Sequence, residues 1–247
     1  MVISLLQWNI WYKESIKNIA SFLLQNKADI ICLQELMHNF SNQEVANTTQ
    51  YLADKLGYKY YEKSISIEGE SWQQANGILT HFPIVQQGYS WINEPISTEK
   101  SYDNEHRAYV ETMLNINGTN LTVGTTHMSY TDGLINTKRK QAEADRLVNI
   151  IERKNSNYIL TGDFNATPDS YTIQHITKYL KNIGPGYEKN TWTTKPFSHK
   201  EFTETDLNRR LDYVFATKDI HVKKAKILST EYSDHLPIFT ELMINTS

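Results

Sequence analysis

Carboxylate, carboxamide and imidazole side chains recur in this chain just after short apolar runs. The clearest case is the segment 158–165, where an apolar run and a glycine precede Asp163 and Asn165. Such a run is typical of a buried strand, and in open α/β folds ligands bind where the strands end. An ordinary Asp/Asn turn is the alternative for this segment taken alone.

Comparable residues lie at or just beyond the ends of other predicted strands: Asn9, Glu35, His127, Asp212, Asp234 and His235. Carboxylate and carboxamide oxygens are the ligands that hard divalent cations prefer, Mg2+ above all, and Glu35 is the clearest ligand candidate. No His or Cys pair has the spacing of a zinc site. The sequence also contains no glycine-rich phosphate loop and no Gly-x-Ser-x-Gly elbow.

Hydrolysis of a phosphate ester would use all of these side chains. It needs positive charge, a base or orienting group for water, donors for the developing charge and help for the leaving oxygen. Each residue also has an ordinary explanation: Glu35 as a surface carboxylate, His127 as a hydrogen-bonded core residue, and Asp212 as the partner of a neighbouring arginine. A separate explanation for each residue accounts poorly for the presence of all of them in one chain. Together the residues therefore favour a phosphoesterase site.

The elements that position these residues begin with a strand over residues 2–10, a helix over 13–25 and a strand over 29–35. This succession predicts two parallel, neighbouring strands. Asn9 and Glu35 should therefore lie near the carboxyl edge of the same sheet.

Later segments continue the alternation, as apolar periodicity and turn residues indicate. The pattern predicts a helix over 42–56, a strand over 58–67, a pair of strands around a turn at 76–85, a loop over 89–104, a hairpin over 107–126, a helix over 135–154, a helix N-cap at 167 followed by proline, an irregular segment over 184–208, and strands over 211–215, 222–228 and after 233. No repeat or linker divides the chain. Residues 1–247 are therefore expected to form one α/β domain of two packed sheets with helices outside.

The composition, with 39% hydrophobic and 21% charged residues, is that of an ordinary globular protein. A net charge of −3 argues against a general nucleic-acid coating protein, although it is compatible with a local basic groove. The only cysteine, Cys32, lies in an apolar run, which excludes an internal disulfide and favours a buried structural thiol. The first residues do not resemble a signal peptide, and no apolar run approaches the roughly 20 residues of a membrane helix. We expect a cytoplasmic protein without membrane insertion or an obligate protein partner.

Short motifs in chain order carry a resemblance to a known family. They are Gln-Trp-Asn-Ile at 7–10, Leu-Gln-Glu at 33–35, Asn-Gly-Ile-Leu-Thr at 76–80, Glu-His-Arg at 105–107, Thr-His-Met at 126–128, Gly-Asp-Phe-Asn at 162–165, Arg-Leu-Asp-Tyr at 210–213 and Ser-Asp-His at 233–235. Each motif alone is weakly specific, but together they span nearly the whole chain. The chain resembles the endonuclease/exonuclease/phosphatase superfamily, the metal-dependent phosphoesterases with a deoxyribonuclease-I-like fold.

The resemblance implies a four-layer α/β sandwich, in which two packed mixed β-sheets are flanked by helices and carry the site at one end. It also implies a Mg2+ cofactor, for which Mn2+ can substitute. Glu35 would hold the metal, with Asn9 and Asp234 close to the metal or the phosphate.

The resemblance further implies catalytic and binding roles. Asp163 would orient or deprotonate the attacking water, and Asn165 would hydrogen-bond the phosphoryl oxygens. His235, oriented by Asp212, would be a general acid/base or a transition-state donor. The remaining implied groups are His127, as a second phosphate or proton-transfer group, and Arg107 and Asn76, as phosphate-binding residues. Which of Asp163 and His235 takes the proton stays open.

Departures from the family pattern narrow the choice of branch. The abasic-site endonucleases usually carry Asn-Gly soon after the first motif, whereas Trp-Tyr-Lys stands at 11–13 here. They also usually place a tyrosine at the position of His127, where histidine is more similar to the deoxyribonuclease, sphingomyelinase and phosphatase branches. Deoxyribonuclease-I-like enzymes have a glutamate where Gln-Gln stands at 73–74. The residue that would support His127 is therefore left open, with Glu105 as a candidate substitute.

These observations favour a Mg2+-dependent hydrolase of phosphate esters, first of all a phosphodiesterase or nuclease that acts on DNA or RNA with activated water. Single strands could stack on rim tryptophans, although packing is the more ordinary explanation for most of them. The candidates are Trp11, Trp72, Trp91 and Trp192. The alternative is a phosphoesterase of a small molecule or lipid headgroup, similar to a sphingomyelinase or an inositol phosphatase. An inactive binding module is disfavoured, because no principal motif is broken.

Overall fold

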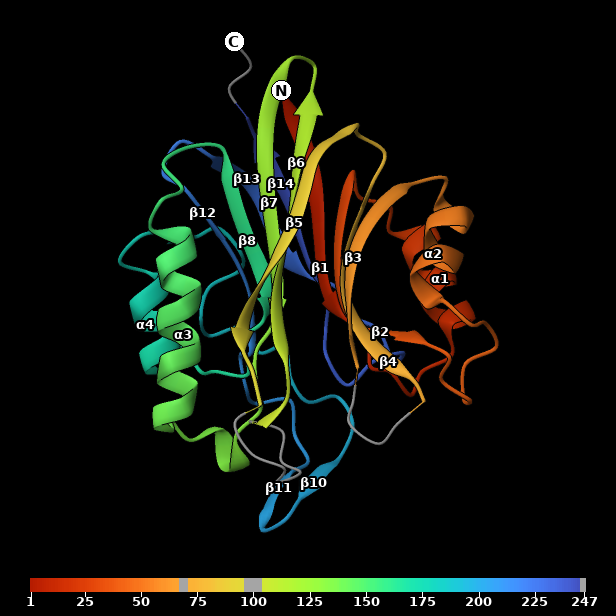
Figure 1. Cartoon of the computed structure of the whole chain (residues 1–247), viewed down its shortest axis with the longest axis vertical. Coiled ribbons are helices and arrows are strands. Elements are labelled where there is room, and N and C mark those ends of the chain that lie inside the picture. The colour runs from red at the N-terminus through yellow and green to blue at the C-terminus, as the bar shows by residue number, and fades with distance from the viewer. Residues whose placement is uncertain (67–70, 96–103, 245–247) are drawn as a thin grey trace.

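The computed structural model describes residues 1–66, 71–95 and 104–244, which form two six-stranded β-sheets and a small hairpin. The first sheet has the strand order β13-β14-β1-β2-β4-β3. Its strands are β1 (Val2–Asn9), β2 (Ile30–His38), β3 (Lys59–Ser66), β4 (Gln73–Thr80), β13 (His221–Ile227) and β14 (Ile238–Met243). Helices α1 (Ile16–Gln25) and α2 (Thr48–Leu56) lie on its outer side (Figure 1).

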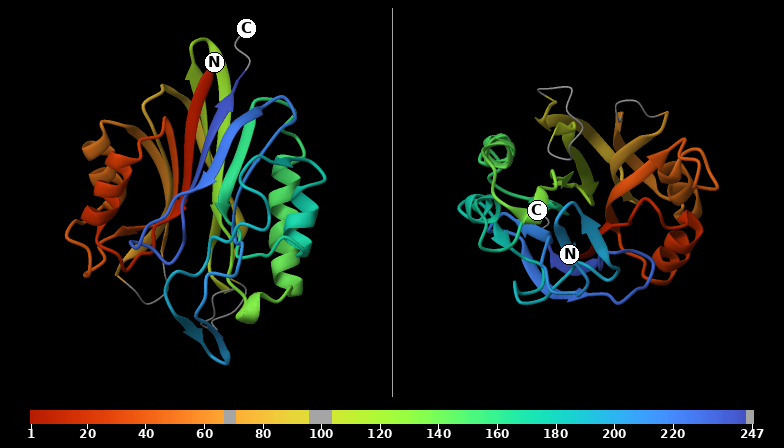
Figure 2. Two further views of the ribbon diagram at one scale, coloured as in Figure 1. Left: turned by 180° about the vertical axis from the view of Figure 1, so that it is seen from behind. Right: turned by 90° about the horizontal axis from the view of Figure 1, so that it is seen from below.

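The second sheet has the order β5-β6-β7-β8-β12-β9. Its strands are β5 (Ile84–Asn93), β6 (Arg107–Ile116), β7 (Thr119–His127), β8 (Tyr158–Asp163), β9 (Lys181–Asn182) and β12 (Asp212–Ala216). Helices α3 (Lys138–Ile151) and α4 (Tyr171–Ile176) cover its outer side, opposite the first helix pair (Figures 1 and 2). The 3-10 turn η2 (Asp132–Leu134) precedes α3, and β10 (Phe197–His199) pairs with β11 (Phe202–Glu204) in the hairpin.

Both sheets are mixed, because β1 pairs in parallel with β2 and β7 pairs in parallel with β8, while the other neighbours are antiparallel. The predicted fold class, an α/β sandwich of two mixed sheets flanked by helices, is therefore confirmed. No helix among the described residues is long and apolar enough to cross a membrane.

The core is apolar on both faces of each sheet. In β1, Leu5 packs between the sheets, whereas Leu6 and Trp8 pack under the helices on the other face. This double burial explains why the strand sequence is almost continuously apolar. Cys32 is fully buried between the sheets, as expected, and burial raises the pKa of its thiol to about 12.

Strand register brings the polar strand ends to one end of the sandwich. Asn9 lies opposite Gln34 in the parallel pair β1–β2, as the predicted strand-helix-strand unit requires. In the other sheet, Asp163 pairs with His127 on one side and with Asp212 on the other. The side chains that the sequence spreads over most of the chain thus converge at a single edge.

The predicted pair of strands around a turn at 76–85 is present as β4 and β5, and the turn carries the chain from the first sheet to the second. Another predicted connection is wrong. The predicted loop over 89–104 is wrong for residues 89–93, which belong to β5 and pair with β6. Residues 96–103 of that prediction lie outside the described residues.

Helix starts differ from the predictions because the capping side chains lie further along the chain. The helix predicted to begin at 42 starts at Thr48, after the Asn47 cap. The helix predicted at 167 starts at Tyr171, where Ser170 Oγ accepts a hydrogen bond from Ile173 N. The hydroxyl of Thr167 donates to Asp169 Oδ1 (2.6 Å), and residues 168 and 169 form a turn that precedes the helix. Similarly, α3 begins after a Thr137 cap and not at 135.

Candidate active site

The carboxylate of Asp163, at the end of β8, is the centre of the site. Its Oδ1 accepts a hydrogen bond from Asn165 N (2.9 Å), and its Oδ2 accepts one from Asn9 Nδ2 (3.0 Å). The Nε2 atoms of His127 and His235 both lie 3.5 Å from Oδ2. Burial raises the pKa of Asp163 to about 6, although these donors and the nearby imidazole favour its charged form.

His235 lies between two carboxylates. Its Nδ1 donates to Asp212 Oδ2 (2.8 Å), while its Nε2 faces Asp163. Burial alone would lower the pKa of His235, but the charges of Asp212, Asp163 and Asp234 outweigh it and raise the pKa well above its ordinary value. The imidazole is therefore held as a cation in a fixed orientation.

Glu35 reaches the cavity because β2 is irregular at this point. The pairing of β2 with β4 shifts register between Leu33 and Leu36, and Glu35 has a left-handed backbone with a φ of 62°. A bulge of this kind turns one side chain away from the regular in-and-out alternation. The Glu35 carboxylate accepts hydrogen bonds from Tyr12 N (3.0 Å) and Asn9 Nδ2 (3.1 Å).

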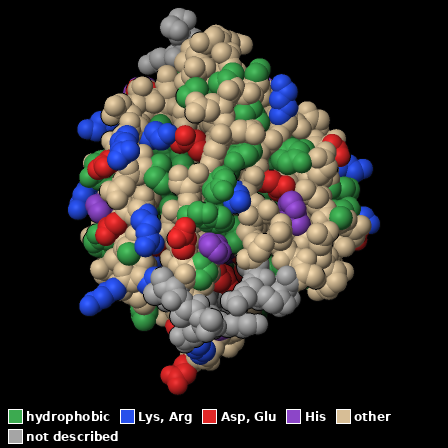
Figure 3. All heavy atoms as spheres, in the orientation of Figure 1, with side chains coloured by type: hydrophobic (Ala, Val, Ile, Leu, Met, Phe, Trp, Pro, Cys, Tyr) green, Lys and Arg blue, Asp and Glu red, His purple; other side chains and the backbone are tan. Residues whose placement is uncertain are grey.

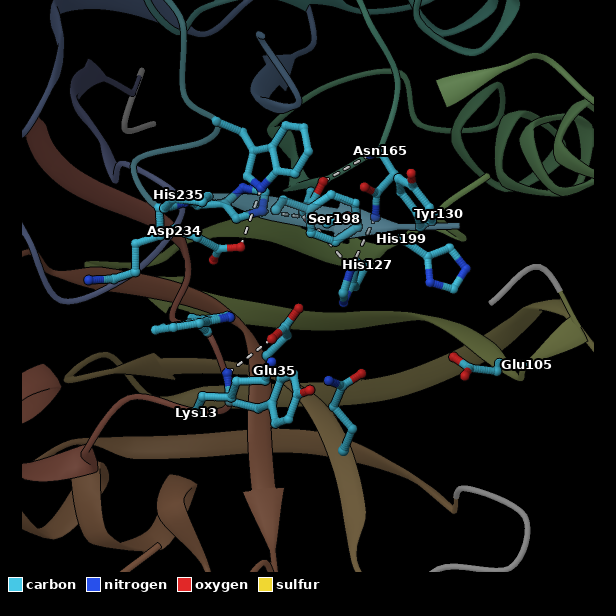
Figure 4. A pocket seen from close by; sticks show the side chains of 18 of the residues that line it. Lys13, Glu35, Glu105, His127, Tyr130, Asn165, Ser198, His199, Asp234 and His235 are labelled. Carbon is cyan, nitrogen blue, oxygen red and sulfur yellow. Dashed lines mark hydrogen bonds and ion pairs between the residues drawn. The ribbon is translucent and has the colours of Figure 1, made fainter. Parts of the chain in front are cut away.

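Asp234 supplies a further carboxylate, which is partly buried and lies in the same cavity as Glu35 (Figure 4). Its Oδ2 accepts a hydrogen bond from Trp192 Nε1 (3.3 Å). Burial raises the pKa of Asp234 to about 6, and the negative charge of Glu35 adds to this shift. Burial likewise raises the pKa of Glu35. Two partly buried carboxylates that repel each other fit a divalent cation with a preference for oxygen ligands.

Asn9 connects the two groups of carboxylates. One amide nitrogen, Nδ2, donates to both Glu35 and Asp163, while Oδ1 accepts a hydrogen bond from Trp11 N (3.1 Å). This arrangement is that of an orienting residue. The metal-ligand role implied by the resemblance would require the carboxamide to turn its oxygen toward Glu35.

A second potential metal group consists of Asp163, Asp212 and His235. One ligand atom of each lies within 4.8 Å of the others, and all three side chains are buried. The hydrogen bond from His235 Nδ1 to Asp212 already accounts for two members of this group. The site thus combines an acid-base cluster with a separate pair of carboxylates, Glu35 and Asp234.

His127 and Asn165 line the cavity beside Asp163 (Figure 4). Asn165 Nδ2 donates to Met128 O (3.0 Å) and lies 3.2 Å from His127 Nε2. Burial and the nearby positive charge of Arg107 lower the pKa of His127 well below its ordinary value, so its ring is neutral. Within the described part of the chain, His127 Nδ1 has no hydrogen-bond partner. Glu105 therefore does not support this histidine.

The two residues implied to bind phosphate lie in different places. Arg107 lines the cavity, where its Nη2 donates to Glu105 Oε2 (2.7 Å). Asn76 is buried in β4, and its Nδ2 donates to Ala108 O (3.1 Å) in the opposite sheet. Asn76 is not among the residues that line the cavity, so the structure brings only Arg107 to the site.

The cavity has a volume of about 350 Å³ and aromatic walls. Acidic side chains are visible in a hollow on the lower part of the face in Figure 3. Three of the four candidate rim tryptophans line the cavity and Trp91 does not. The aromatic and cationic lining residues are Trp11, Tyr12, Trp72, Tyr130, Trp192, Phe197, Lys13, Arg107 and Lys195. The sequence analysis did not identify Tyr12, which follows the first motif, or Phe197, which stands in the segment predicted to be irregular.

Lys140 of α3 supports the site from behind. Its buried ammonium group donates to Ser129 O (2.5 Å) and Phe164 O (2.8 Å), just after β7 and β8. The carboxylate of Glu143, one helical turn further on, accepts a hydrogen bond from Ser129 N (3.0 Å). The sequence signal that could have indicated this supporting role is the presence of a lysine and a glutamate on the apolar face of an amphipathic helix.

The variant Lys140→Met should lower the free energy of unfolding by about 2–4 kcal/mol, because it leaves two buried carbonyls without a donor and Glu143 without its counter-charge. Denaturant unfolding measures this difference. The matched control Lys138→Met alters an exposed lysine of the same helix and should change stability by less than about 0.5 kcal/mol. Equal effects of the two variants would contradict a supporting role for Lys140.

Comparisons with known proteins agree with this geometry. Residues 6–235 match the model of the Endonuclease/Exonuclease/phosphatase family. The fold is similar to that of the human Nocturnin catalytic domain with bound sulfate (TM-score 0.72, 20% identity, covering 99% of this chain and 94% of that chain). It is also similar to TDP2 from D. rerio complexed with single-strand DNA product (TM-score 0.70, 15% identity, covering 99% of each chain).

A third similar structure is a mannosyl-6-phosphatase from Bacteroides thetaiotaomicron (TM-score 0.68, 20% identity, covering 98% of this chain and 100% of that chain). No curated protein matches the sequence. At these identities the structures share the fold alone, whereas the family model matches most of the sequence. The chain therefore belongs to the endonuclease/exonuclease/phosphatase family, whose members hydrolyse phosphate esters.

Proposed function

We propose that this protein is a divalent-metal-dependent phosphodiesterase that attacks its substrate with water activated at Asp163. The observation that carries the proposal is the buried cluster of Asp212, His235 and Asp163, which shares one cavity with the carboxylates of Glu35 and Asp234. The family match over residues 6–235 supports a single catalytic domain.

Glu35 and Asp234 are the proposed metal ligands, and Mg2+ is the proposed cation, with Mn2+ as a substitute. Both carboxylates are partly buried, and each carries a raised pKa that a bound cation would reverse. When bound, the cation would neutralise charge on the phosphoryl oxygens and on the leaving oxygen. Trp192 and Asn9 would hold the two ligands in place through their N–H groups.

Asp163 is the proposed proton acceptor. His235 already carries a proton at neutral pH, because the carboxylates around it stabilise its cationic form. It cannot take a second proton, so it acts as a donor toward the phosphoryl group. Asp163 has one oxygen fixed by Asn165 N and the other by Asn9, which orients the carboxylate for a water in the cavity.

Arg107, Asn165 and neutral His127 form the wall on which the phosphoryl oxygens would lie. Arg107 contributes positive charge, and His127 can donate from one ring nitrogen without a charge change. This arrangement favours an anionic substrate whose phosphorus sits between Asp163 and the carboxylate pair.

A phosphoesterase of a small molecule is the second candidate function. The aromatic cavity of about 350 Å³ favours it, because this volume matches small-ligand sites, which are roughly 300–1,000 Å³.

The test is a substrate panel with Mg2+, with chelator, and with the variant Asp163→Asn. Plasmid DNA, a single-stranded oligonucleotide, bis(p-nitrophenyl) phosphate and p-nitrophenyl phosphate separate nuclease, small-diester and monoester activity. We expect metal-dependent turnover of at least one diester, lost in the variant. Turnover of the monoester alone would identify the protein as a phosphatase. The absence of metal-dependent turnover for every substrate would contradict the proposal.

A further inference from the structure

Three residues that line the cavity have left-handed backbone conformations. Glu35, Asn165 and Trp11 have φ angles of 62°, 46° and 57°. Such a conformation is uncommon for a bulky residue and costs about 1–3 kcal/mol, whereas glycine adopts it freely. Glu35 and Asn165 already belong to the proposed catalytic machinery. Trp11 shares their strain and their cavity, and so far it has no role.

The backbone of Trp11 is tied to the site on both sides. Trp11 N donates to Asn9 Oδ1 (3.1 Å), and Glu14 N donates to Trp11 O (2.9 Å). The next residue, Tyr12, donates its N–H to Glu35 Oε2 (3.0 Å). The backbone that carries the indole is therefore fixed relative to Glu35 and Asn9, which favours a pre-organised binding surface.

Two ammonium groups flank the indole of Trp11. Lys13 Nζ lies 5.8 Å and Lys195 Nζ 5.5 Å from the ring centroid, both within the range of a cation–π contact. Lys195 comes from the segment that leads to the β10–β11 hairpin, and its Nζ also donates to Glu231 O (2.7 Å). A ring that stacks on Trp11 would displace one of these ammonium groups from the face of the indole and would still lie beside positive charge, which suits a ligand with an anionic group next to its ring.

The cavity limits the size of such a ligand. Its volume of about 350 Å³ is at the lower end for small-molecule sites, and aromatic rings from both halves of the chain line it. Base–aromatic stacking contributes about 1–3 kcal/mol per base. The geometry favours a single ring-bearing phosphate ester over a long helical polymer.

We propose that Trp11 is the platform for an aromatic ring of the substrate and that Lys13 and Lys195 bind a second anionic group, so that the substrate class is nucleotide-like phosphate esters. The assignment rests on the proposed function, because it takes the phosphate beside Asp163 as given. It adds the specificity-determining residues, which lie outside the acid-base cluster and the carboxylate pair.

The test is binding without turnover, by calorimetry with Mg2+ and the Asp163→Asn variant as parent. The ligands are inorganic phosphate, ribose 5-phosphate, adenosine 5′-monophosphate and adenosine 3′,5′-bisphosphate. The monophosphate should bind about ten-fold more tightly than ribose 5-phosphate. Adding Trp11→Gly should remove that preference and leave the affinities of phosphate and ribose 5-phosphate unchanged. Adding Lys13→Gln with Lys195→Gln should remove the further gain of the bisphosphate.

A loss of stability in the Trp11→Gly variant is not expected to affect this test. Because glycine accepts the φ angle of Trp11, the Trp11→Gly variant should melt at or above the temperature of the parent. The matched control is Trp91→Phe, set against Trp11→Phe. Trp91 is also half-buried and has Lys63 Nζ 5.1 Å from its ring centroid, but it lies outside the cavity lining. Its variant should leave all four affinities unchanged.

Equal binding of ribose 5-phosphate and the adenosine monophosphate by the parent would overturn the proposal, as would a loss in Trp11→Gly that is the same for all four ligands. A failure of the proposed function is seen separately, because hydrolysis is measured on the wild-type protein with the substrate panel. Ring-selective binding without metal-dependent hydrolysis would uphold the platform and reject the phosphodiesterase.

Discussion

Replacing Asp163 with asparagine is expected to lower kcat for phosphodiester hydrolysis by about 10³- to 10⁴-fold while the protein stays folded. The carboxamide keeps the size of the side chain and can still accept the hydrogen bond from Asn165 N. It cannot take a proton from water. The loss should therefore fall on kcat, with a small change in KM, when both are measured on bis(p-nitrophenyl) phosphate.

The matched control for this variant is Asp169→Asn, on the same loop. Asp169 is exposed, and its carboxylate accepts a hydrogen bond from the Thr167 hydroxyl outside the cavity. Its replacement should leave kcat within about two-fold of wild type, as is usual for a surface position. If Asp163→Asn retained more than about a tenth of the wild-type kcat, Asp163 could not be the proton acceptor.

Loss of the carboxylate pair should have an effect of similar size on metal binding. Glu35→Gln and Asp234→Asn each remove one charged oxygen ligand from a partly buried site, so each should weaken Mn2+ binding by at least about 100-fold. Calorimetry on the folded proteins measures this directly. Chelation of the metal should abolish turnover in the wild type, and added Mg2+ or Mn2+ should restore it.

Glu44→Gln is the matched control for the metal experiment. Glu44 lies on the surface, where its carboxylate accepts a hydrogen bond from the Ser15 hydroxyl (2.8 Å), and its replacement should leave Mn2+ affinity unchanged. The assignment would be reversed if Glu35→Gln and Asp234→Asn kept full affinity while Asp212→Asn lost it. The metal would then belong to the Asp163, Asp212 and His235 cluster, whose ligand atoms lie within 4.8 Å of one another.

Local patterning in the sequence predicts the strands that end in the candidate site residues. Apolar runs and turn residues place Asn9 at the end of β1 and Asp163 at the end of β8, because strand formation depends on local patterning. The succession of a strand, a helix and a strand also predicted a parallel pair, because a helical crossover returns the chain to the end of the sheet where the first strand began. The ordered motifs then indicated the family, which the family match confirmed.

Helix starts and the sheet membership of β4 and β5 were less predictable. Each helix begins where a side chain caps free N–H groups, and several Ser, Thr and Asn residues could fill that role. Only the packed structure selects one of them. A short turn between two apolar runs likewise fits either a hairpin or a crossing between sheets, because the sequence of the turn does not encode the partner strand.

Tertiary structure alone decided which side chains share the cavity. Asn76 stands in a family motif but is turned toward Ala108 of the other sheet, whereas Tyr12 stands in no motif and donates its N–H to Glu35. Lys140 reaches the loops that follow β7 and β8 from a helix whose sequence is that of an ordinary amphipathic helix. These contacts depend on the relative position of two sheets and their loops. That position is set by packing between residues distant in sequence, and no local pattern carries it.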